Sequence, residues 1–424
     1  MDRGNGWVAR RRVVVTGIGV VSPNGIGREA FWRATRDGLS GVGTIALFDP
    51  SALPCQIAGE IEGFRSEDYL SAKELRRVAR AVPLAIAATR EALESAQVAG
   101  ASMTLEEKRS WGVVLGSGGG APDFMEEQYR LYFSDQLKKT SAYNIPGSTM
   151  GTLSSEISLG FDLRGPSHVL STGCTSSTDA MGYAFNLIRF GLADHLITGG
   201  VDATITPAIM HGFSIMRAVS LSHNHEPGRA SRPFDRRRDG FVLGEGAWIF
   251  IFEERELALK RGAPIYAEIL GYGSTCDAYH MVRLDPRGEE PARAMQLALQ
   301  DGGVAKEEVG YIALHGTSTV LNDQTETRAL KLCFGQRAYD IPMSSIKSMI
   351  GHPQGASGAA GVAAAILGMR DSFLPPTINY EEADPQCDLD YIPNQGIARE
   401  VEVSLCNCIA FGSKNSALVV ARAT

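Results

Sequence analysis

The sequence predicts an α/β protein with largely parallel sheets, and two observations support this prediction. Short apolar runs typical of buried strands recur along the chain, and each ends in glycine or other small residues. Helix-like segments lie between these runs, and strands that alternate with helices are typical of parallel sheets. The chain has 424 residues, of which 44% are hydrophobic and 21% are charged, an ordinary balance for a globular protein with a large core.

The predicted elements alternate from the start of the chain to its end. The strand-like runs are residues 13–17, 111–116, 195–200, 311–316 and 405–412. The helix-like segments, which are amphipathic or rich in small residues, are residues 71–96, 179–190, 289–300 and 355–369. Gly358, Ala359 and Gly361 would let the last of these helices lie close to its neighbours, so we expect it to be buried.

The two halves of the chain share a plan. In residues 171–203 a Gly/Ser loop leads into a helix and then a strand, and in the second half a small-residue loop from Gly351 leads into a helix and later a strand. This likeness predicts an internal duplication, although the residue identity between the halves is too weak to prove it. We therefore expect two units, residues 1–260 and 261–424.

Composition excludes several classes of function. A net charge of −7 provides no basic field for nucleic acid. The polar N-terminus lacks the apolar core of a signal peptide, and no apolar stretch reaches the roughly 20 residues that span a bilayer, so we expect a cytoplasmic protein without a membrane role. The seven cysteines are scattered, which argues against a disulfide framework. The close pair Cys406 and Cys408 has no second pair or nearby histidine to complete a zinc site.

The segment around Cys174 has the pattern of a nucleophile turn. A strand over residues 167–170 leads into a tight Gly-containing turn, and a helix follows immediately. A cysteine at a helix N-terminus meets unpaired N–H groups and the helix dipole, which lower the pKa of a thiol. The alternative interpretation is a small buried cysteine that behaves as a hydrophobic residue.

Two histidines occupy comparable turns. His315 ends an apolar strand, at the edge where open α/β sheets place their sites, and His352 precedes a small-residue helix. Either histidine alone is more often structural. Together with Cys174 they form a Cys/His/His set in which neutral imidazoles would donate N–H groups to a thioester oxygen and stabilise an enolate.

With these residues identified, the chain resembles the elongating beta-ketoacyl-acyl carrier protein synthases over nearly its whole length. The segments that carry the resemblance are residues 13–23 (VVVTGIGVVSP), 163–167 (LRGPS), 230–235 (ASRPFD), 239–247 (DGFVLGEGA), 277–281 (DAYHM) and 347–352 (KSMIGH). Residues 172–176 (TGCTS) resemble the ketosynthase (alpha) subunit of type II polyketide systems more than the fatty-acid enzymes, which usually have alanine before the cysteine. The resemblance implies a thiolase-like, duplicated five-layer α-β-α-β-α architecture, with the cysteine in residues 1–260 and both histidines in residues 261–424.

The resemblance also implies roles for individual residues. Cys174 would accept the acyl chain, and His315 and His352 would assist decarboxylation of a malonyl unit, whose carbanion attacks the Cys174 thioester. Lys347 would organise the site, with the acidic Asp323 and Glu326 beside it. Phe411 would be the gating residue, and its backbone N–H would form an oxyanion hole with that of Cys174. The family needs no cofactor or metal, because acyl groups arrive on the phosphopantetheine of an acyl carrier protein.

This sequence departs from the family at four positions. Ala410 and Ser413 replace two glycines of the gate loop, so its motion is expected to differ. Gly361 stands where relatives often have an acid, which leaves Glu326 as the expected hydrogen-bond partner of the lysine. Gly119 stands where relatives often have an apolar residue, and we hypothesise that it opens room for a long or rigid acyl chain.

Carrier proteins are acidic, so a docking surface should be basic. Candidates are Lys73, Arg76 and Arg77 on one helix, with Arg80 a turn further, together with Lys138, Lys139 and Arg217. A solvated basic face is the alternative interpretation of these residues. As a partner within the enzyme, the resemblance implies either a second copy of the chain or a chain-length-factor-like subunit.

Four functions compete at this point. The first is an elongating ketosynthase of polyketide or fatty-acid biosynthesis. A thiolase would need a second catalytic cysteine, and Cys408 is not in that motif. An initiating synthase has asparagine where this chain has His352. A non-catalytic chain-length subunit lacks the nucleophile, so Cys174 argues against that role.

Overall fold

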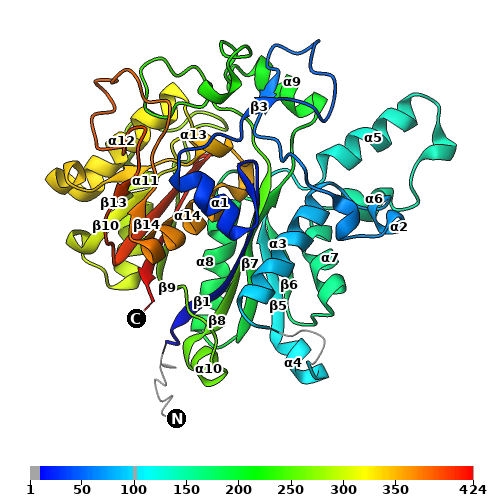
Figure 1. Cartoon of the computed structure of the whole chain (residues 1–424), viewed down its shortest axis with the longest axis horizontal. Helices are drawn as coiled ribbons and strands as arrows, with labels where there is room; N and C mark the ends of the chain where they lie inside the picture. Colours follow the sequence, from blue (N-terminus) through cyan, green and yellow to red (C-terminus); the bar gives the residue numbers. More distant parts are fainter. Residues whose placement is uncertain (1–9, 99–102, 424) are drawn as a thin grey trace.

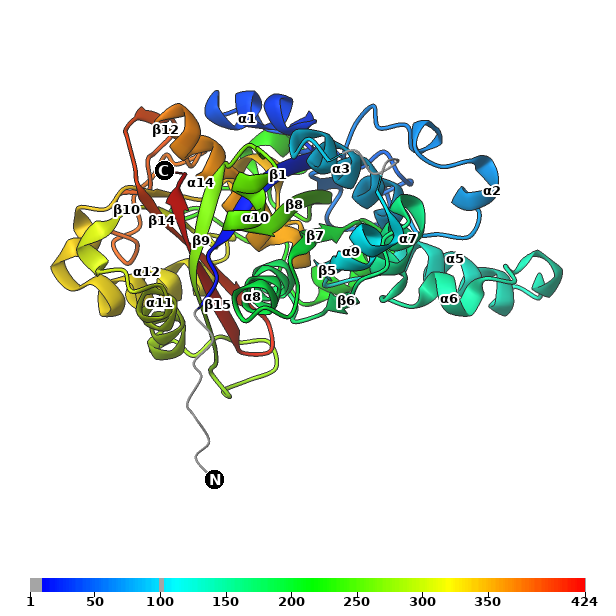
Figure 2. The ribbon, with the colours of Figure 1, turned by 90° about the horizontal axis from the view of Figure 1, so that it is seen from below.

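The computed structural model describes residues 10–98 and 103–423, and its main feature is an 11-stranded mixed β-sheet (Figures 1 and 2). The strand order is β11-β10-β14-β15-β9-β1-β8-β7-β5-β6, and β2 pairs with β1 off this path. The bounds of these strands are β1 Val13–Ser22, β2 Gly25–Ile26, β5 Trp111–Gly116, β6 Ser167–Leu170, β7 His195–Asp202, β8 Gly246–Glu254, β9 Ala267–Cys276, β10 Val309–Ala313, β11 Met343–Ser344, β14 Val403–Ala410 and β15 Lys414–Arg422. Two small sheets pair β3 (Gly43–Thr44) with β4 (Ile57–Ala58) and β12 (Phe373–Leu374) with β13 (Ile397–Ala398). All five predicted strands are present.

The strand order repeats in the two halves of the sheet. Read outward from the middle, the first half is β1-β8-β7-β5-β6 and the second is β9-β15-β14-β10-β11, so each half places its first, fifth, fourth, second and third strands in the same order. The halves meet where β1 and β9 pair antiparallel. This repeat supports the expected duplication. The division at residues 260 and 261 stays a proposal, and it falls between α10 (Arg255–Lys260) and β9.

The prediction of largely parallel sheets is wrong for the middle of the sheet. The parallel pairs lie toward the two edges, where β5 pairs with β6 and β7, and β10 pairs with β11 and β14. The central strands from β7 to β14 pair antiparallel. One reason is local: only residues 411–413 connect β14 to β15, and so short a connection joins antiparallel neighbours.

Helices and half-sheets form five layers, as the resemblance implied (Figure 2). Two helices cover the outer face of the first half, two lie between the halves, and two cover the outer face of the second half. In that order they are α3 (Ala81–Ser95) and α7 (Thr152–Phe161), α8 (Ser176–Arg189) and α14 (Ser357–Asp371), and α11 (Glu289–Gly302) and α12 (Val320–Phe334). The expected burial of the small-residue helix is confirmed, because α14 lies in the central layer.

The remaining helices are short or peripheral. Their bounds are α1 Arg28–Arg36, α2 Ala72–Leu75, α4 Leu105–Ser110, α5 Pro122–Phe133, α6 Asn144–Ser148, α9 Pro207–Ile215 and α13 Lys347–Ile350. The 3₁₀ turns are η1 Ser66–Asp68, η3 Leu137–Lys139, η4 Pro227–Arg229, η5 Lys306–Glu308, η6 Gly335–Tyr339 and η7 Gln354–Ala356. Helices α5 and α6 project from the body (Figure 1). None of the helices in the described residues has the length and apolarity to cross a membrane.

The helix expected over residues 71–96 is two helices, α2 and α3, separated by residues 76–80. Proline explains the break. A helix that continued through Pro83 would bring its ring against the carbonyl of Ala79 and lose the bond between them. The chain instead starts a new helix at Ala81, where Pro83 falls in the first turn and its missing N–H costs nothing.

The two central helices approach closely at Gly358. A Cβ atom at this position would lie 1.9 Å from Oγ1 of Thr178 on α8, so no larger residue fits without moving one helix. This contact matters for the site, because α8 follows Cys174 and α14 follows His352 in the chain.

Glu253 on β8 is a buried carboxylate whose partners come from separate segments. His195 Nδ1 lies 3.1 Å from its Oε2, Arg261 Nε lies 2.9 Å from the same oxygen, and the Thr16 hydroxyl donates to the other oxygen, Oε1. Burial alone raises the pKa of this carboxyl. The hydrogen bonds from these three residues outweigh burial and lower the pKa to about 2.

Glu253 is therefore expected to stabilise the fold at neutral pH and to lose this effect in acid. A carboxyl whose pKa is lowered in the folded state stabilises that state at pH values above its ordinary pKa of 4.5. This stabilisation disappears as the pH falls toward 2. We expect Glu253→Gln to lower the free energy of unfolding at neutral pH by roughly 3 kcal/mol. Denaturant unfolding at neutral pH and near the acid limit of stability measures this, with Glu256→Gln on α10 as the exposed control. A penalty equal at both pH values would contradict the assignment.

Candidate active site

Cys174 lies in the turn between β6 and α8, as the sequence predicts. Gly173 has a φ of +72°, a left-handed conformation that glycine adopts without strain. The Ser176 hydroxyl donates to the Gly173 carbonyl at 2.6 Å and accepts the Thr172 N–H at 2.9 Å. Asp179 in the first turn of α8 accepts from the Thr172 hydroxyl at 2.5 Å. The turn is thus fixed from within, and the nucleophile stands one residue before the helix N-cap.

The predicted lowering of the Cys174 pKa is wrong. The side chain is 6% exposed, and burial raises the pKa of this thiol to about 11. The nearby charge of Lys347 and the backbone N–H groups of Phe411 and Cys174 oppose this rise without overcoming it. Removing a thiolate from water costs more free energy than the favourable interaction with one helix N-terminus provides. The thiol of Cys174 is therefore neutral at rest.

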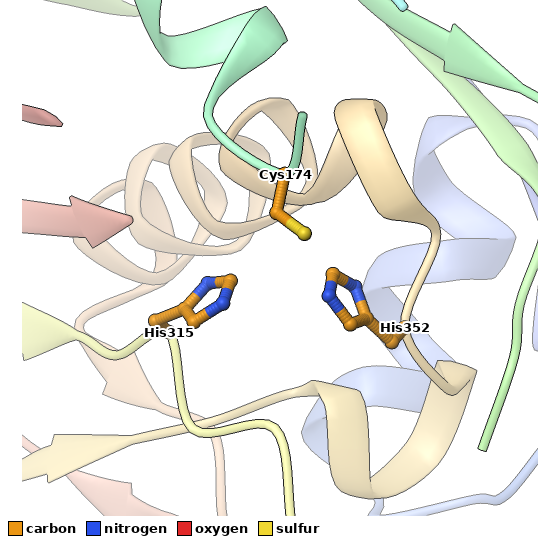
Figure 3. Close-up of side chains that lie close together, drawn as sticks. All are labelled: Cys174, His315 and His352. Atoms are coloured by element: carbon orange, nitrogen blue, oxygen red, sulfur yellow. The ribbon is translucent and has the colours of Figure 1, made fainter. Parts of the chain in front are cut away.

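His315 and His352 converge on Cys174 (Figure 3). His315 follows β10 and His352 follows α13, so two separate loops of the second half reach the cysteine of the first. One potential ligand atom from each of the three side chains lies within 4.8 Å of the others. The ring centroids of the histidines are 5.4 Å apart, and the rings are nearly perpendicular at 86°.

Both imidazoles are buried and neutral. Burial, followed by the charge of Lys347, lowers the pKa of both rings well below 6.5, and His352 lowers that of His315 further. At neutral pH each ring therefore carries one proton on one nitrogen. A neutral imidazole can donate one hydrogen bond and accept one proton, which is the chemistry that a thioester reaction at Cys174 requires.

A different polar side chain contacts Nδ1 of each histidine. The Ser357 hydroxyl, in the first turn of α14, lies 2.8 Å from Nδ1 of His352. The Cys408 sulfur, on β14, lies 3.5 Å from Nδ1 of His315 and 3.1 Å from the carbonyl oxygen of Cys174. The Nε2 atoms are therefore the ring nitrogens left for the space shared with Cys174.

Lys347 is buried beside the triad. Burial lowers the pKa of its ammonium, and the neighbouring Cys408, Glu326, Cys174 and Asp323 act in the opposite direction. Within the described part of the chain neither acid forms an ion pair with Lys347, so the expected hydrogen bond to Glu326 is absent there. The field of the lysine acts on the thiol and on both rings.

The two acids instead hold the loop that carries His315. Glu326 accepts the backbone N–H groups of His315 and Gly316, each at 2.7 Å, and the side chain of Asn407 at 2.7 Å. Asp323 accepts the Thr317 N–H at 3.1 Å and pairs with Arg238 at 3.1 Å. These contacts explain the need for two buried acids on α12. They fix the backbone of the loop that carries His315.

The gate loop between β14 and β15 places a backbone donor at the thiol. The backbone N–H of Phe411 lowers the pKa of the Cys174 thiol, which is the electrostatic effect that an oxyanion hole needs. Ser413, which replaces a glycine, has a φ of +66°. Its hydroxyl donates to the His280 carbonyl at 3.0 Å and accepts the Tyr279 N–H at 3.3 Å. The departure from glycine therefore ties this loop to residues 277–280.

Gly119 does not face open space. A Cβ atom there would lie 2.2 Å from Cγ2 of Thr204, so the room expected at this position is not present in the direction of a side chain. The close approach has a cause: the buried carboxylate of Asp202 accepts the N–H groups of Gly118 and Gly119 at 2.8 and 2.9 Å and that of Gly355 at 2.6 Å. An effect of Gly119 on chain length stays a prediction. By contrast, Gly361 has only Ala313 Cβ nearby, at 3.7 Å.

A cavity of about 300 Å³, open to solvent, leads to the triad. Cys174, His315 and His352 all line it. Its walls mix apolar side chains with hydroxyl and amide groups, and they include Phe241, Leu284, Thr317, Thr319, Asn322, Ile409 and Phe411. Arg217 and Arg283 also line it and are exposed. The lining is largely apolar with a few polar groups, as is usual for a site that binds a small organic group.

The predicted docking residues separate into two groups. Lys73, Arg76, Lys138, Lys139 and Arg217 are exposed. In contrast, Arg77 pairs with Glu156 at 3.3 Å, and Arg80 pairs with the buried Glu245 at 2.7 Å. The prediction that residues 73–80 form one basic helix is wrong, because α2 ends at Leu75. Of the predicted docking set, Arg217 is the member that lines the cavity.

The same Cys/His/His set could in principle coordinate a metal ion. Zinc bonds to nitrogen and sulfur measure about 2.0 to 2.3 Å, so the three side chains would have to contract around the ion. The ammonium of Lys347 would also oppose a second cation at this place. Both features disfavour a metal ion at this place, and the absence of a metal stays a prediction.

Sequence reasoning missed several residues that the structure brings to the site. Ser357, Asp202 and Arg283 were not singled out, and Cys408 was considered only as a metal ligand and as the second cysteine of a thiolase. Ser357 had a signal, since it is a hydroxyl residue within an Ala/Gly-rich helix five positions after His352. Arg283 had none, because its place beside the cavity depends on the tertiary fold.

Comparison with known proteins gives matches over most of the chain. The family described as "Beta-ketoacyl synthase, N-terminal domain" matches residues 10–258, and "Beta-ketoacyl synthase, C-terminal domain" matches residues 266–381. The 3-oxoacyl-(acyl-carrier-protein) synthase 2 of Synechocystis sp. is 41% identical over 409 residues, which cover 96% of this chain and 97% of that protein.

Two further matches come from polyketide systems. The tetracenomycin polyketide synthase ketoacyl synthase alpha subunit of Streptomyces glaucescens is 41% identical over 424 residues, covering 98% of both chains. The solved structure of the ishigamide ketosynthase/chain length factor superposes with a TM-score of 0.91 at 32% identity, covering 98% of this chain and 100% of that one.

Proposed function

The chain belongs to the beta-ketoacyl synthase family and is an acyltransferase, and from this premise we propose that it extends acyl chains on an acyl carrier protein in type II polyketide biosynthesis. The observation that carries the proposal is the convergence of the Cys174 thiol with two neutral imidazoles at the end of an open cavity. Cys174 provides the nucleophile, and His315 and His352 provide the proton chemistry.

The first step would load the acyl chain. The Cys174 sulfur adds to the carbonyl carbon of an acyl thioester, and the negative oxygen that forms receives the N–H groups of Cys174 and Phe411. The bond between the carbonyl carbon and the carrier's sulfur then breaks. The proton lost by Cys174 ends on the departing carrier thiol, so the acyl group has moved from one sulfur to another.

The second step would form the new carbon–carbon bond. The carbon–carbon bond of a malonyl thioester breaks, carbon dioxide leaves, and the electron pair enters an enolate whose oxygen is stabilised by imidazole N–H. The enolate carbon attacks the acyl carbonyl on Cys174. The carbon–sulfur bond to Cys174 breaks with its electron pair on the sulfur, the thiolate takes up a proton from solvent, and a β-ketoacyl chain remains on the carrier.

The polyketide assignment rests on residues 172–176 (TGCTS) and on the likeness to the ketoacyl synthase alpha subunit of the tetracenomycin system. Fatty-acid elongation is the second candidate, and the equally similar 3-oxoacyl-(acyl-carrier-protein) synthase 2 supports it. A reconstituted reaction with malonyl-carrier separates the two. A polyketide enzyme is expected to accept a β-ketoacyl-carrier as primer without prior reduction, whereas extension of saturated primers alone would overturn the polyketide assignment. Product masses on the carrier report the result, with Cys174→Ala as the blank.

A partner subunit would suit the exposed apolar side chains of the projecting α5–α6 region. Tyr132, Phe133 and Ile145 are 58%, 79% and 78% exposed there. Exposed apolar clusters of this kind mark interaction sites. The β6 strand also lies at the end of the main sheet, with unpaired backbone groups along one side. We propose that a second copy or a chain-length-factor-like subunit covers this region, and the ishigamide ketosynthase/chain length factor is a structural precedent.

The carrier is expected to dock beside Arg217. A carrier protein is acidic, its arm bears a phosphate, and Arg217 is an exposed cation on the wall of the cavity. We expect Arg217→Glu to raise the apparent KM for the acyl carrier about tenfold, with little change in kcat. Steady-state kinetics against carrier concentration measures this.

A matched control is Lys260→Glu, an exposed charge reversal on α10, which lies at the opposite end of the molecule from α9 (Figure 1). Alkylation of Cys174 by iodoacetamide should be unchanged in both variants. An equal rise in KM in the two variants would show that net charge, rather than Arg217, is responsible.

A further inference from the structure

We propose that Ser357 is a positioning residue that fixes the tautomer of His352, so that Nε2 of this ring carries a lone pair and takes the proton of Cys174. The two catalytic histidines then have different roles. His352 is the base of the loading step, and His315 is the N–H donor of the condensing step. This division deepens the proposed function and rests on it for its chemical purpose, although the geometry stands on its own.

The Ser357 hydroxyl has one proton for two close contacts. Its oxygen lies 2.7 Å from the Gln354 carbonyl oxygen and 2.8 Å from Nδ1 of His352. A hydroxyl has one proton, and a carbonyl has none to give. Both short contacts contain a proton only if Ser357 donates to Gln354 and His352 Nδ1–H donates to Ser357.

The opposite arrangement is unfavourable. If the hydroxyl donated to Nδ1, the oxygens of Ser357 and Gln354 would stand 2.7 Å apart with no proton between them. Ser357 is 3% exposed and His352 is 3% exposed, so no bulk water is at hand to relieve that repulsion. The ring is held in the Nδ1–H form, and its Nε2 is unprotonated.

The surroundings keep this ring neutral until it receives a proton. Burial and then the charge of Lys347 lower the pKa of His352 well below 6.5. The rings of Phe241 and His352 pack edge to face with their centroids 5.3 Å apart, and Phe241 contributes no charge. The other titratable groups that face the ring are His315 and Cys174, both neutral at rest. A neutral imidazole beside a neutral thiol can accept its proton, which leaves an imidazolium beside a thiolate.

His315 lacks an equivalent hydroxyl. Its Nδ1 faces the Cys408 sulfur at 3.5 Å, and this thiol also lies 3.1 Å from the Cys174 carbonyl, a stronger acceptor for its single proton. Sulfur bonds weakly, so Nδ1 of His315 is not committed to carry the proton. His315 is therefore free to place its proton on Nε2, where an enolate oxygen would receive it.

The proton balance of the loading step follows. Cys174 S–H gives its proton to Nε2 of His352, which becomes a cation with Nδ1–H still bonded to Ser357. The thiolate forms the new carbon–sulfur bond, and the bond to the carrier sulfur breaks with its electron pair on that sulfur. The carrier thiolate takes the proton from Nε2, and His352 returns to its starting tautomer.

Two measurements on the intact protein test the proposal. ¹⁵N NMR of histidine-labelled protein, assigned by difference from His352→Gln, should show Nδ1 protonated and Nε2 unprotonated in the resting wild type. In Ser357→Ala, single-turnover acylation of Cys174 by acyl-carrier should fall roughly 10- to 100-fold, because the base is no longer held in the correct tautomer. Ser357→Thr keeps the hydroxyl and should recover most of the rate. Ser416→Ala, a buried serine on β15 outside the site, is the matched control.

A pH profile separates positioning from loss of structure. Iodoacetamide alkylation of Cys174 should be slower in Ser357→Ala at neutral pH, and the difference should close as the pH approaches the thiol pKa of about 11, where the thiol ionises without a base. A rate loss that is constant with pH, or an Nε2–H signal from resting His352, would overturn the proposal. If these results hold but no acyl chain is extended, the tautomer stands and the proposed condensation fails.

Discussion

Replacing Cys174 by alanine is expected to reduce chain extension by roughly 10⁴- to 10⁶-fold, the loss typical when the nucleophile of a catalytic set is removed. Among the described residues, Cys174 is the thiol that forms a converging set with His315 and His352. One potential ligand atom of each of these three side chains lies within 4.8 Å of the others. Without this sulfur the acyl chain cannot be held covalently on the enzyme until the enolate attacks it. Product formation on the carrier, followed by mass spectrometry, measures the loss.

The same variant should retain decarboxylation of malonyl-carrier. That step needs an N–H donor for the enolate oxygen, and the loop of His315 is held by Glu326 independently of the thiol. Cys276→Ala is a suitable control, because Cys276 is an exposed free thiol outside the site. Full extension activity in Cys174→Ala, or acylation that maps to another cysteine, would remove the basis of the proposed mechanism.

Features set by nearby residues were predictable from the sequence. The apolar runs became β1, β5, β7, β10 and β14, since their pattern is contained within a few residues. The turn at Cys174 was predictable for the same reason: a strand, a glycine with φ of +72° and a helix follow one another directly. The expected roles of Cys174, His315 and His352 could not be inferred from the local sequence pattern alone, and the resemblance to the family motifs indicated them.

Features set by distant residues were not predictable. The prediction of a lowered pKa for Cys174 was wrong because it considered the end of α8 but not the burial imposed by the second half of the chain. Arg77 and Arg80 looked like a docking surface until Glu156 and Glu245, far along the chain, proved to be their partners. Gly119 looked like open space because the approach of Thr204 depends on the pairing of β5 with β7.

The site is therefore an assembly of two halves, and this explains its electrostatics. The nucleophile comes from the first half, and both histidines, Lys347 and the gate loop come from the second. Bringing them together buries every titratable group, so the thiol, the two rings and the lysine all have pKa values shifted toward their neutral forms. A thiol and two imidazoles that are neutral at rest can bind an acyl chain and separate charge only when the thioester is present.

Replacing His315 by alanine is expected to lower condensation about 1000-fold while leaving Cys174 able to accept an acyl chain. Removal of one donor to a developing oxyanion costs about 100- to 1000-fold, and His315 is the donor that the enolate oxygen would meet. The loop should survive the change, because Glu326 holds the backbone N–H of residue 315 rather than its side chain. Carbon dioxide release from malonyl-carrier and intact mass of the acylated protein separate the two steps.

His211→Ala, on the exposed surface of α9, is the control for loss of an imidazole. The decisive comparison is with His352→Ala, which removes the proposed base and should slow acyl loading in addition to condensation. If the two variants lost loading and decarboxylation in equal proportion, the histidines would share one function and the asymmetry imposed by Ser357 would have no chemical consequence. Unequal losses are the outcome that the contacts around the two Nδ1 atoms require, because one ring is bonded to a hydroxyl at 2.8 Å and the other faces a sulfur at 3.5 Å.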